Sequence, residues 1–487
     1  MNWQGARDWA ALQAKLEREG ETFNVEKLRA PPLDEARNFC AIEPLRGIAL
    51  AASGDSAAKA KLEALEGTVL PAGDHNSQKP ALGEGLAFGR GPDVHGWVEY
   101  LRAQGYCGPA SSSPEGHGML AALDAAHPLL KRLAVEAEAR PLAGFVPGTP
   151  VAHPRLSADR GYYSGPVRAG KALVVRALVA GGEGDHQAAC QSIQAALRFA
   201  AALQREPSLL ALLVERHLHE ITEAAVWEML HQRLATDGEL QAMQASLSAL
   251  DFQAATLNGL RGEVAEMIDL IDFVQGDAAE FVKYSKADLF EGAAVPPPSI
   301  LFAMWHALPA GWFDENKTVV ASLVHEELVS PLKAGGLGEA VRRPATFEKK
   351  EALRGGPWQP YYFFARTMIP PYNGIVLVEA YSETVRCQGV AACALERWYL
   401  QHHAYPTTLQ ELVPAFLPVV PADPMDNRPM RYALTDDGRY MLWSIGPDGK
   451  DDRGKVNTAA KSEITSSQLR HHTYHGDWVW QYTPVKQ

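Results

Sequence analysis

The sequence predicts an α+β protein in which a large, irregular all-α part precedes a small unit with a long helix on an antiparallel sheet. Two observations predict this order. Between Met119 and about Leu289, apolar residues recur every three or four positions, which is typical of amphipathic helices. From Met430 to Ser444, two alternating runs flank Asp-Asp-Gly438, which is typical of a β-hairpin with a tight turn.

Composition divides the chain into four segments. Residues 1–118, which are rich in Gly, Pro and Ser between 38 and 116, are predicted to form an irregular wrap with short helices. Residues 119–290 are predicted to be a helical-hairpin domain, and 291–372 a Pro- and aromatic-rich connector with helices. Residues 373–487 are predicted to be the α+β unit. In the connector, the glycines of 335–338 are interpreted as a loop.

The helical-hairpin domain shows ordinary start and stop signals. The turn at 181–185 is rich in glycine and ends in Asp185, which predicts the N-cap of the following helix. The arrangement resembles a tetratricopeptide-like array, although the fixed 34-residue period of that family is missing. The helices are expected at Arg168–Ala180, His186–Leu203, Pro207–Leu234 and Asp237–Ala249, with a further helix starting at His127-Pro128.

The α+β unit has an ordered set of unlike pieces. A spine helix is expected from about Asn373 to His403, followed by a short helix that Thr408 caps. The predicted hairpin then has strands at 430–434 and 439–444. The tail 476–482 alternates aromatic and small residues and is expected to add an edge strand.

This order of parts resembles the globular domain of the major pseudopilin of type II secretion systems. The resemblance covers about a fifth of the chain and implies the fold more than the function, because folds are reused for many functions. The whole plan also resembles large bacterial envelope proteins. The matching pieces are Ala394–Tyr399, Tyr405–Thr407, Leu409–Val413, Val420–Pro424, Arg431–Tyr432 and Leu442–Gly449.

One departure from that family concerns the membrane. A pseudopilin begins with a leader that ends in Gly, followed by an apolar span that carries a Glu near its start. Gly374-Ile-Val-Leu-Val-Glu379 imitates this signature, but 380–389 is polar and the position is internal. We therefore expect Gly374–Glu379 to be the first turn of an amphipathic spine helix.

The loop after the hairpin is the candidate metal site. In the resembling family this loop binds calcium, and Asp448 stands where that family places one ligand. Asp451 and Asp452 lie close enough in sequence to contribute, and Asp477 from the tail is an additional candidate. The alternative is an Asp-Gly surface turn that needs no ion, which such composition often produces. The basic and neutral stretch 453–461 leaves the family's later acidic ligand without a counterpart.

Charge and cysteine content exclude other classes of protein. The formal net charge is −12, and Lys and Arg form only short pairs, so no nucleic-acid partner is expected. The five cysteines, which show no C-x-x-C spacing, do not indicate a disulfide framework. Neither a signal peptide at Met1–Trp9 nor a membrane span is predicted. The chain is expected in the cell envelope or periplasm, with an N-terminal anchor removed; the alternative is the cytoplasm.

Few residues suggest catalysis. Glu215 and His219 have the i, i+4 spacing that places two side chains on one helix face, whereas His325 lacks the second histidine of a zinc-protease helix. His471 and His475 could bind zinc only if their segment were helical. Glu263, Glu266, Asp269 and Asp272 form an acidic stripe that is typical of a solvated helix face.

These observations lead to two functional hypotheses. The first is a non-enzymatic envelope or secretion-associated scaffold that binds protein partners through its surfaces. The second is an envelope hydrolase of polysaccharide or peptide that uses paired carboxylates such as Glu263 and Asp269. A platform for its substrate would come from the aromatic residues of the connector, namely Trp305, Trp312, Phe313, Trp358, Tyr361, Tyr362, Phe363 and Phe364.

Overall fold

The structure is a computed structural model of the 487-residue chain. It describes residues 2–53, 55–68, 86–106, 118–146, 161–233, 235–277, 309–343, 372–456 and 476–483, together with 80, 82 and 279.

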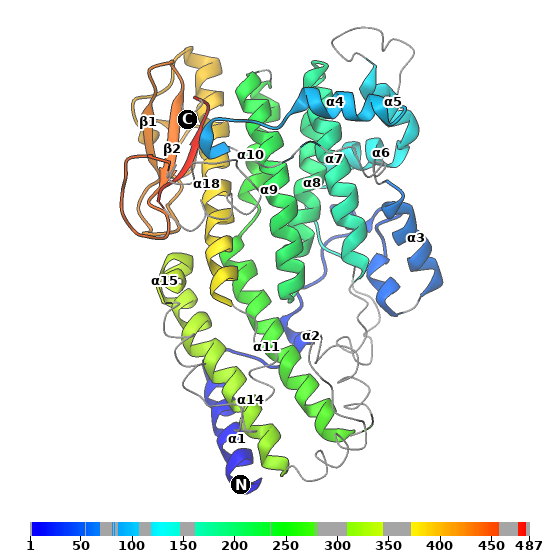
Figure 1. The fold of residues 1–487 in the computed structure, drawn as a ribbon, viewed down its shortest axis with the longest axis vertical. Helices are drawn as coiled ribbons and strands as arrows, with labels where there is room; N and C mark the ends of the chain where they lie inside the picture. Colours follow the sequence, from blue (N-terminus) through cyan, green and yellow to red (C-terminus); the bar gives the residue numbers. More distant parts are fainter. Residues whose placement is uncertain are drawn as a thin grey trace.

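A bundle of long helices forms the body of the molecule (Figure 1). Neighbouring helices in sequence pack against one another, in the order α7 on α8 and α8 on α9. The region predicted to be helical, 119–290, therefore does contain a succession of helices. The helices of the body are α7 (Ser164–Gly182), α8 (His186–Gln204), α9 (Leu209–Gln232), α10 (Asp237–Ser248) and α11 (Phe252–Gly276).

Local signals in the sequence determine where these helices begin. Asp185 caps α8 as predicted, because its side chain accepts a hydrogen bond from the Ala188 N–H. Thr236 and Glu239 form a reciprocal capping box at the start of α10. Pro128 stands in the first turn of α6 (Pro128–Ala139), where its missing N–H costs nothing.

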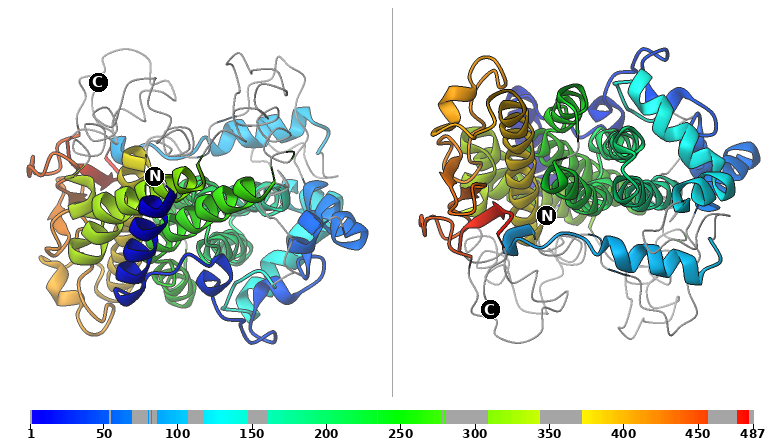
Figure 2. Two further views of the ribbon diagram at one scale, coloured as in Figure 1. Left: turned by 90° about the horizontal axis from the view of Figure 1, so that it is seen from below. Right: turned by 90° about the horizontal axis from the view of Figure 1, so that it is seen from above.

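The predicted spine helix is present as α18 (Tyr372–His402), the longest helix among the described residues. It packs against α9, α10 and α11 on one side and against the small sheet on the other (Figures 1 and 2). Its middle is buried almost completely, including Ala391–Leu395. A helix that is buried nearly all round belongs to the core rather than to a surface.

The sheet is antiparallel, with the order β1-β2-β3. Strands β1 (Arg431–Leu434) and β2 (Tyr440–Ser444) form the predicted hairpin, and Gly438 supplies the positive φ of its turn. Strand β3 (Trp478–Gln481) adds to β2 as the sequence predicts. Its free side is covered by η3 (Leu86–Phe88), where Gln481 Nε2 donates to the Ala87 carbonyl.

Shorter helices complete the molecule. Helix α1 (Asn2–Arg18) lies against α14 (Ala310–Val324) at the end of the body where the N-terminus is found (Figure 1). The same helical run continues as η5 (His325–Val329), which is a π-helix, and α15 (Ser330–Val341). The remaining helices are α2 (Val25–Leu28), η1 (Phe39–Ala41), η2 (Ile48–Ser53), α3 (Ser56–Glu66), α4 (Val94–Ala103), α5 (Met119–Ala126), η4 (Gly161–Tyr163) and η7 (Leu409–Leu412).

The interpretation of 335–338 as a loop is wrong. These residues lie inside α15, which bends at Gly336, where φ is +75°. Gly338 is needed for a close approach: its N–H donates to the Pro424 carbonyl, and a Cβ here would lie 2.4 Å from the Met425 carbonyl oxygen. The glycines therefore permit helix-to-loop packing rather than a helix end.

One continuous hydrophobic core joins all four predicted segments. It includes Leu16, Leu197, Val320 and Leu395, and it reaches Trp480 in the last strand. Among the described residues no helix is both long enough and apolar enough to cross a membrane.

Candidate functional site

Three glutamates and one histidine lie in the interface between α9 and α18. Glu215, His219 and Glu223 follow one another at four-residue steps along α9, and Glu379 lies near the start of α18. Each is at most 1% exposed. We call these four residues the α9–α18 acid cluster. Charged residues are seldom buried so completely without a partner, so the cluster is the most unusual polar feature of the described structure.

Close packing brings successive residues of α9 opposite successive residues of α18. Glu215 lies near Glu379 at one end of the cluster. At the other end, a Cβ on Gly389 would lie 3.0 Å from Glu223 Oε2, so the glycine lets the helix backbone approach the carboxylate. The His219 ring packs on Phe252 of α11, with centroids 4.7 Å apart.

Most polar atoms of the cluster have no hydrogen-bond partner among the described residues. Gln204 Nε2 donates to Glu215 Oε1 at 3.4 Å, but Glu215 Oε2 and both oxygens of Glu223 and Glu379 are unpartnered. His219 Nε2 lies 3.5 Å from Glu223 Oε1, and the backbone of Ser382 on α18 also interacts with the His219 ring. Each buried polar atom without a partner costs about 1–3 kcal/mol, so such a group requires an explanation.

Burial shifts the pKa of every member toward its neutral form. Desolvation raises the pKa of Glu223 and of Glu379 to about 8, and it lowers the pKa of His219 to about 3. Desolvation also raises the pKa of Glu215 well above its usual range, and the nearby Glu379 carboxyl adds to this effect. At neutral pH the cluster therefore holds protonated carboxyls and a neutral imidazole.

An ion pair on α18 flanks the cluster. Arg386 Nη2 and Nε donate to the two carboxylate oxygens of Glu383, and the Phe252 N–H also donates to Glu383. Desolvation by itself would lower the pKa of Arg386. The hydrogen bonds and the negative charge of Glu383 have the larger effect and raise that pKa. The charge of Arg386 is thus already balanced by Glu383.

The predicted calcium loop lies after β2, and its polar groups bond mainly to the protein itself. Asp451 Oδ1 accepts from Trp443 Nε1 and the Arg453 N–H, and its Oδ2 faces Arg431 Nε at 3.3 Å. Asp448 Oδ1 accepts from the Lys450 N–H, and the Asp452 N–H donates to Asp477. The structure does not bring the three carboxylates of Asp448, Asp451 and Asp452 together as a ligand set. In the described ranges, no group of three His, Cys, Asp or Glu side chains is arranged to hold a metal ion.

Asp477 does return to this loop, as the sequence suggested. It is fully buried, and its carboxylate accepts from the N–H groups of Asp452 and Gly454. Burial raises the pKa of Asp477 to about 6 despite these hydrogen bonds. Its contacts connect β3 to the loop that follows β2.

Asp423 is another buried carboxylate of the C-terminal unit. It accepts hydrogen bonds from Ser444 Oγ and the Ile445 N–H, and Arg431 Nη1 donates to it at 2.6 Å. Arg431 also binds Asp426, so one guanidinium connects the hairpin to the loop before it. No local pattern in the sequence predicted this network.

The carboxylates of the hydrolase hypothesis do not share one face of α11. Glu263 is partly exposed and Asp269 is exposed, and six positions on a helix place side chains on different sides. Asp272 pairs with Lys317, whereas Glu266 is buried, so the stripe is not uniformly solvated. Trp312 and Phe313 are buried in α14 and stack edge to face. Trp305, Trp358, Tyr361–Phe364, His471 and His475 lie outside the described residues.

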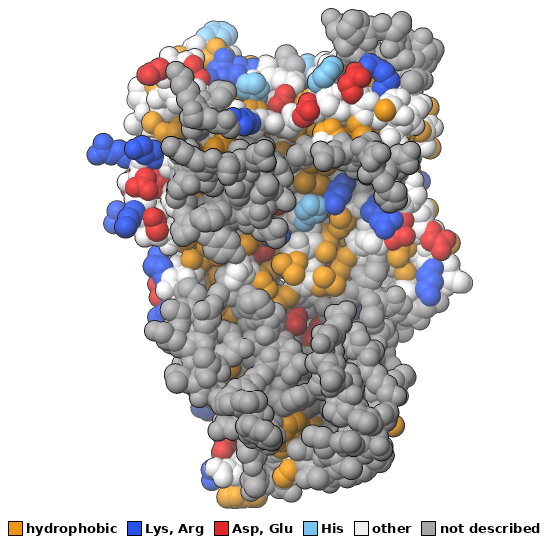
Figure 3. Space-filling view, in the orientation of Figure 1, with side chains coloured by type: hydrophobic (Ala, Val, Ile, Leu, Met, Phe, Trp, Pro, Cys, Tyr) orange, Lys and Arg blue, Asp and Glu red, His pale blue; other side chains and the backbone are white. Residues whose placement is uncertain are grey.

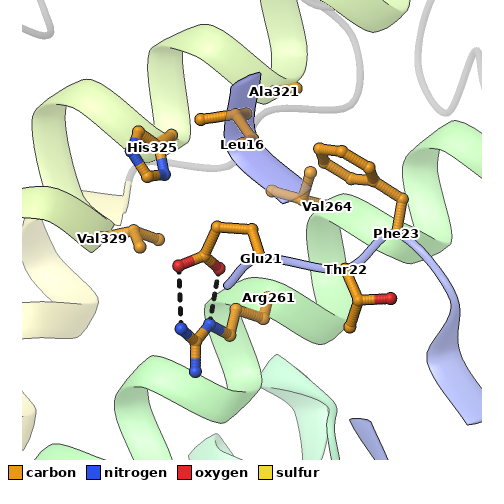
Figure 4. A pocket seen from close by; sticks show the side chains of 9 residues that line it. All are labelled: Leu16, Glu21, Thr22, Phe23, Arg261, Val264, Ala321, His325 and Val329. Atoms are coloured by element: carbon orange, nitrogen blue, oxygen red, sulfur yellow. Dashed lines mark hydrogen bonds and ion pairs between the residues drawn. The ribbon is translucent and has the colours of Figure 1, made fainter. Parts of the chain in front are cut away.

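A pocket lies where the chain after α1 crosses α11 and η5 (Figure 4). Glu21 projects into it and binds Arg261 through two hydrogen bonds of 2.6 and 2.8 Å. Lys333 adds a third at 2.9 Å, and His325 faces Glu19 instead. The polar groups of this pocket therefore satisfy one another. Its other lining residues are Leu16, Thr22, Phe23, Val264, Ala321 and Val329.

The i, i+4 spacing of Glu215 and His219 was the one sequence signal for the acid cluster. Glu223 extends this spacing by another turn, but Glu379 is distant in sequence and joins only through the fold. No protein-family model, curated protein or solved structure matches the chain.

Proposed function

We propose that the protein is a non-enzymatic scaffold of the bacterial cell envelope, associated with secretion, in which a pseudopilin-like unit is presented by a helical body. The observation that carries the proposal is the arrangement of α18 with β1, β2 and β3. A long helix packs on a small antiparallel sheet. The short helix η7 and the hairpin follow the long helix in the order that the sequence predicts. Binding would use surfaces rather than a reactive group.

The junction between body and unit supports a rigid presentation. Trp227 Nε1 of α9 donates to the Gln481 carbonyl, and within the unit Gln388 Nε2 of α18 donates to the Trp478 carbonyl. Arg397 of α18 binds Asp237 and Gln244 of α10. Side chains of the body thus hold both the spine helix and the last strand, which fixes the unit on the scaffold.

The surface of the unit offers sites for a protein partner. Val419 and Leu434 are 68% and 50% exposed, so both present apolar surface to a partner. On the face shown in Figure 3, charged side chains of both signs are interspersed in the described part. Mixed charge of this kind suits a protein partner better than a nucleic acid, which requires clustered cations.

Site-specific photo-crosslinking in the cells that produce the protein tests this proposal. A photoreactive residue at 419 or 434 is expected to give adducts with envelope proteins, identified by mass spectrometry. Val135 on α6 is the matched control, because it is 51% exposed but lies on the helical body. Equal adducts at all three positions, or recovery of the protein outside the envelope fraction, would contradict the proposal.

Calcium binding at Asp448, Asp451 and Asp452 is a separate proposal that rests on the resemblance and on the oxygen-rich composition of the loop. Hydrogen bonds within the protein already order this loop. Calcium would therefore strengthen an existing turn rather than create one.

A further inference from the structure

Several other buried charges of the described structure, unlike the α9–α18 acid cluster, have partners of opposite sign. Arg176 binds Asp124, and Glu21 binds Arg261 together with Lys333. Neither Glu223 nor Glu379 accepts a hydrogen bond from any described residue, and Glu215 accepts only from an amide. The cluster is therefore buried without a counter-charge bonded to it.

The groups that face the cluster do not supply that charge. On α9 itself, the positive charge of Arg216 lowers the pKa of Glu215 and of Glu379 from a distance. The ion pair of Arg216 is with Glu220. On α18, the charge of Arg386 acts on Glu223 and His219 from a distance, while its hydrogen bonds go to Glu383. The other facing groups include Gln204 of α8, Asp251 and Phe252 at the start of α11, Tyr381, Cys393 and the backbone of Ser382 on α18, and Lys171 of α7, which acts on His217.

A buried carboxyl without a counter-charge is stable only when it keeps its proton. Two carboxylates side by side, as at Glu215 and Glu379, would repel each other as well. Ionisation therefore favours any state in which water reaches the interface between α9 and α18. Each carboxyl that becomes exposed to water in that state releases one proton. A higher pH therefore favours the open state.

We propose that the α9–α18 acid cluster is a proton-operated latch. With Glu215, Glu223 and Glu379 protonated, it holds α18 against α9; when these protons are lost, the contact loosens. Because α18 carries the C-terminal sheet through Gln388 and Trp478, loosening changes how firmly the sheet is held. The latch does not depend on which partner the unit binds.

Native cysteines report the opening directly. Cys387 and Cys393 lie on α18 and are buried, whereas the equally buried Cys40 lies in η1, away from this interface. The full-length protein is alkylated with iodoacetamide between pH 6 and 9, and each cysteine is quantified by peptide mass spectrometry. Every rate is divided by the rate of the same cysteine in the urea-unfolded chain at the same pH, which removes the effect of thiol ionisation.

In the wild type, the normalised rates at Cys387 and Cys393 are expected to rise about tenfold per pH unit for each proton released. The rate at Cys40 is expected to stay constant. In the Glu215→Gln/Glu379→Gln variant, which keeps two members neutral at every pH, the slope is expected to fall. Glu411→Gln is the matched control: this exposed glutamate caps η7 and should leave the slope unchanged.

Three results would overturn the latch. The first is the same slope in the wild type and the double variant, or in Glu223→Gln if the double variant does not fold. The second is labelling of Cys40 in parallel with Cys393, which would show global unfolding. The third is exposure of Cys393 at pH 6 by a chelator alone, which would show that a bound metal ion, rather than protons, neutralises the cluster.

Discussion

Glu215 of α9 and Glu379 of α18 lie near each other inside the molecule, where burial and then the Glu379 carboxyl raise the pKa of Glu215. Neither accepts a hydrogen bond from an arginine or lysine within the described ranges. Their burial is therefore compatible with the fold only in the protonated form, which makes folding sensitive to pH.

We predict that the protein loses stability as the pH rises from about 5 to 8. Burial raises the folded-state pKa of Glu223 and Glu379 to about 8, above the ordinary value of 4.5. The contribution of these two groups to the free energy of unfolding is fully present below pH 4.5. It is lost as the pH rises through 8. The free energy of unfolding should fall by about 1.4 kcal/mol per pH unit for each proton retained on folding. Urea unfolding at several pH values measures this; a free energy that rises over the interval would refute it.

Arg431→Ala should destabilise the C-terminal unit. The substitution leaves the fully buried Asp423 without its cation, and removing one partner of a buried ion pair typically costs about 3–5 kcal/mol. We expect about 2–4 kcal/mol, because Arg431 itself is partly exposed. Arg428→Ala is the control: this arginine is 79% exposed, so its loss should change stability by less than about 1 kcal/mol. Chemical denaturation followed by tryptophan fluorescence compares the two variants.

Gly338→Ala should separate α15 from the loop before the hairpin. The added methyl group would lie 2.4 Å from the Met425 carbonyl oxygen, so backbone must move, and overpacking of this kind costs about 1–3 kcal/mol. Gly238→Ala in α10 has no atom within 4 Å of the new methyl group and should instead stabilise by about 0.5–1 kcal/mol. Thermal melting of both variants tests the difference. Equal melting temperatures would contradict the close contact.

Calcium should raise the melting temperature if the acidic loop binds it, because a ligand that binds only the folded state stabilises that state. Asp448→Ala should abolish the shift, and a chelator should reverse it in the wild type. Asp436→Ala, in the hairpin turn, is a control acidic residue outside the loop. A melting temperature that is the same with calcium and with chelator would show that this loop does not bind calcium.

Local patterns predicted most of the regular elements. The alternation around Gly438 predicted the hairpin, and the capping residues Asp185 and Thr408 predicted helix starts, because these signals act over a few residues. The glycines of 335–338 misled the prediction. Their role is to admit the backbone of Met425, and a distant neighbour cannot be seen in a local pattern.

The amino-acid sequence by itself determined the helical body, the spine helix α18 and the three-stranded sheet, since periodicity and turn chemistry are local properties. Only the tertiary structure decided that Glu379 meets Glu215, that Asp423 binds Arg431 and that Asp477 returns to the loop after β2. Such contacts depend on which helix faces and loops are packed together, and the same packing removes the water that would otherwise keep these carboxyls ionised.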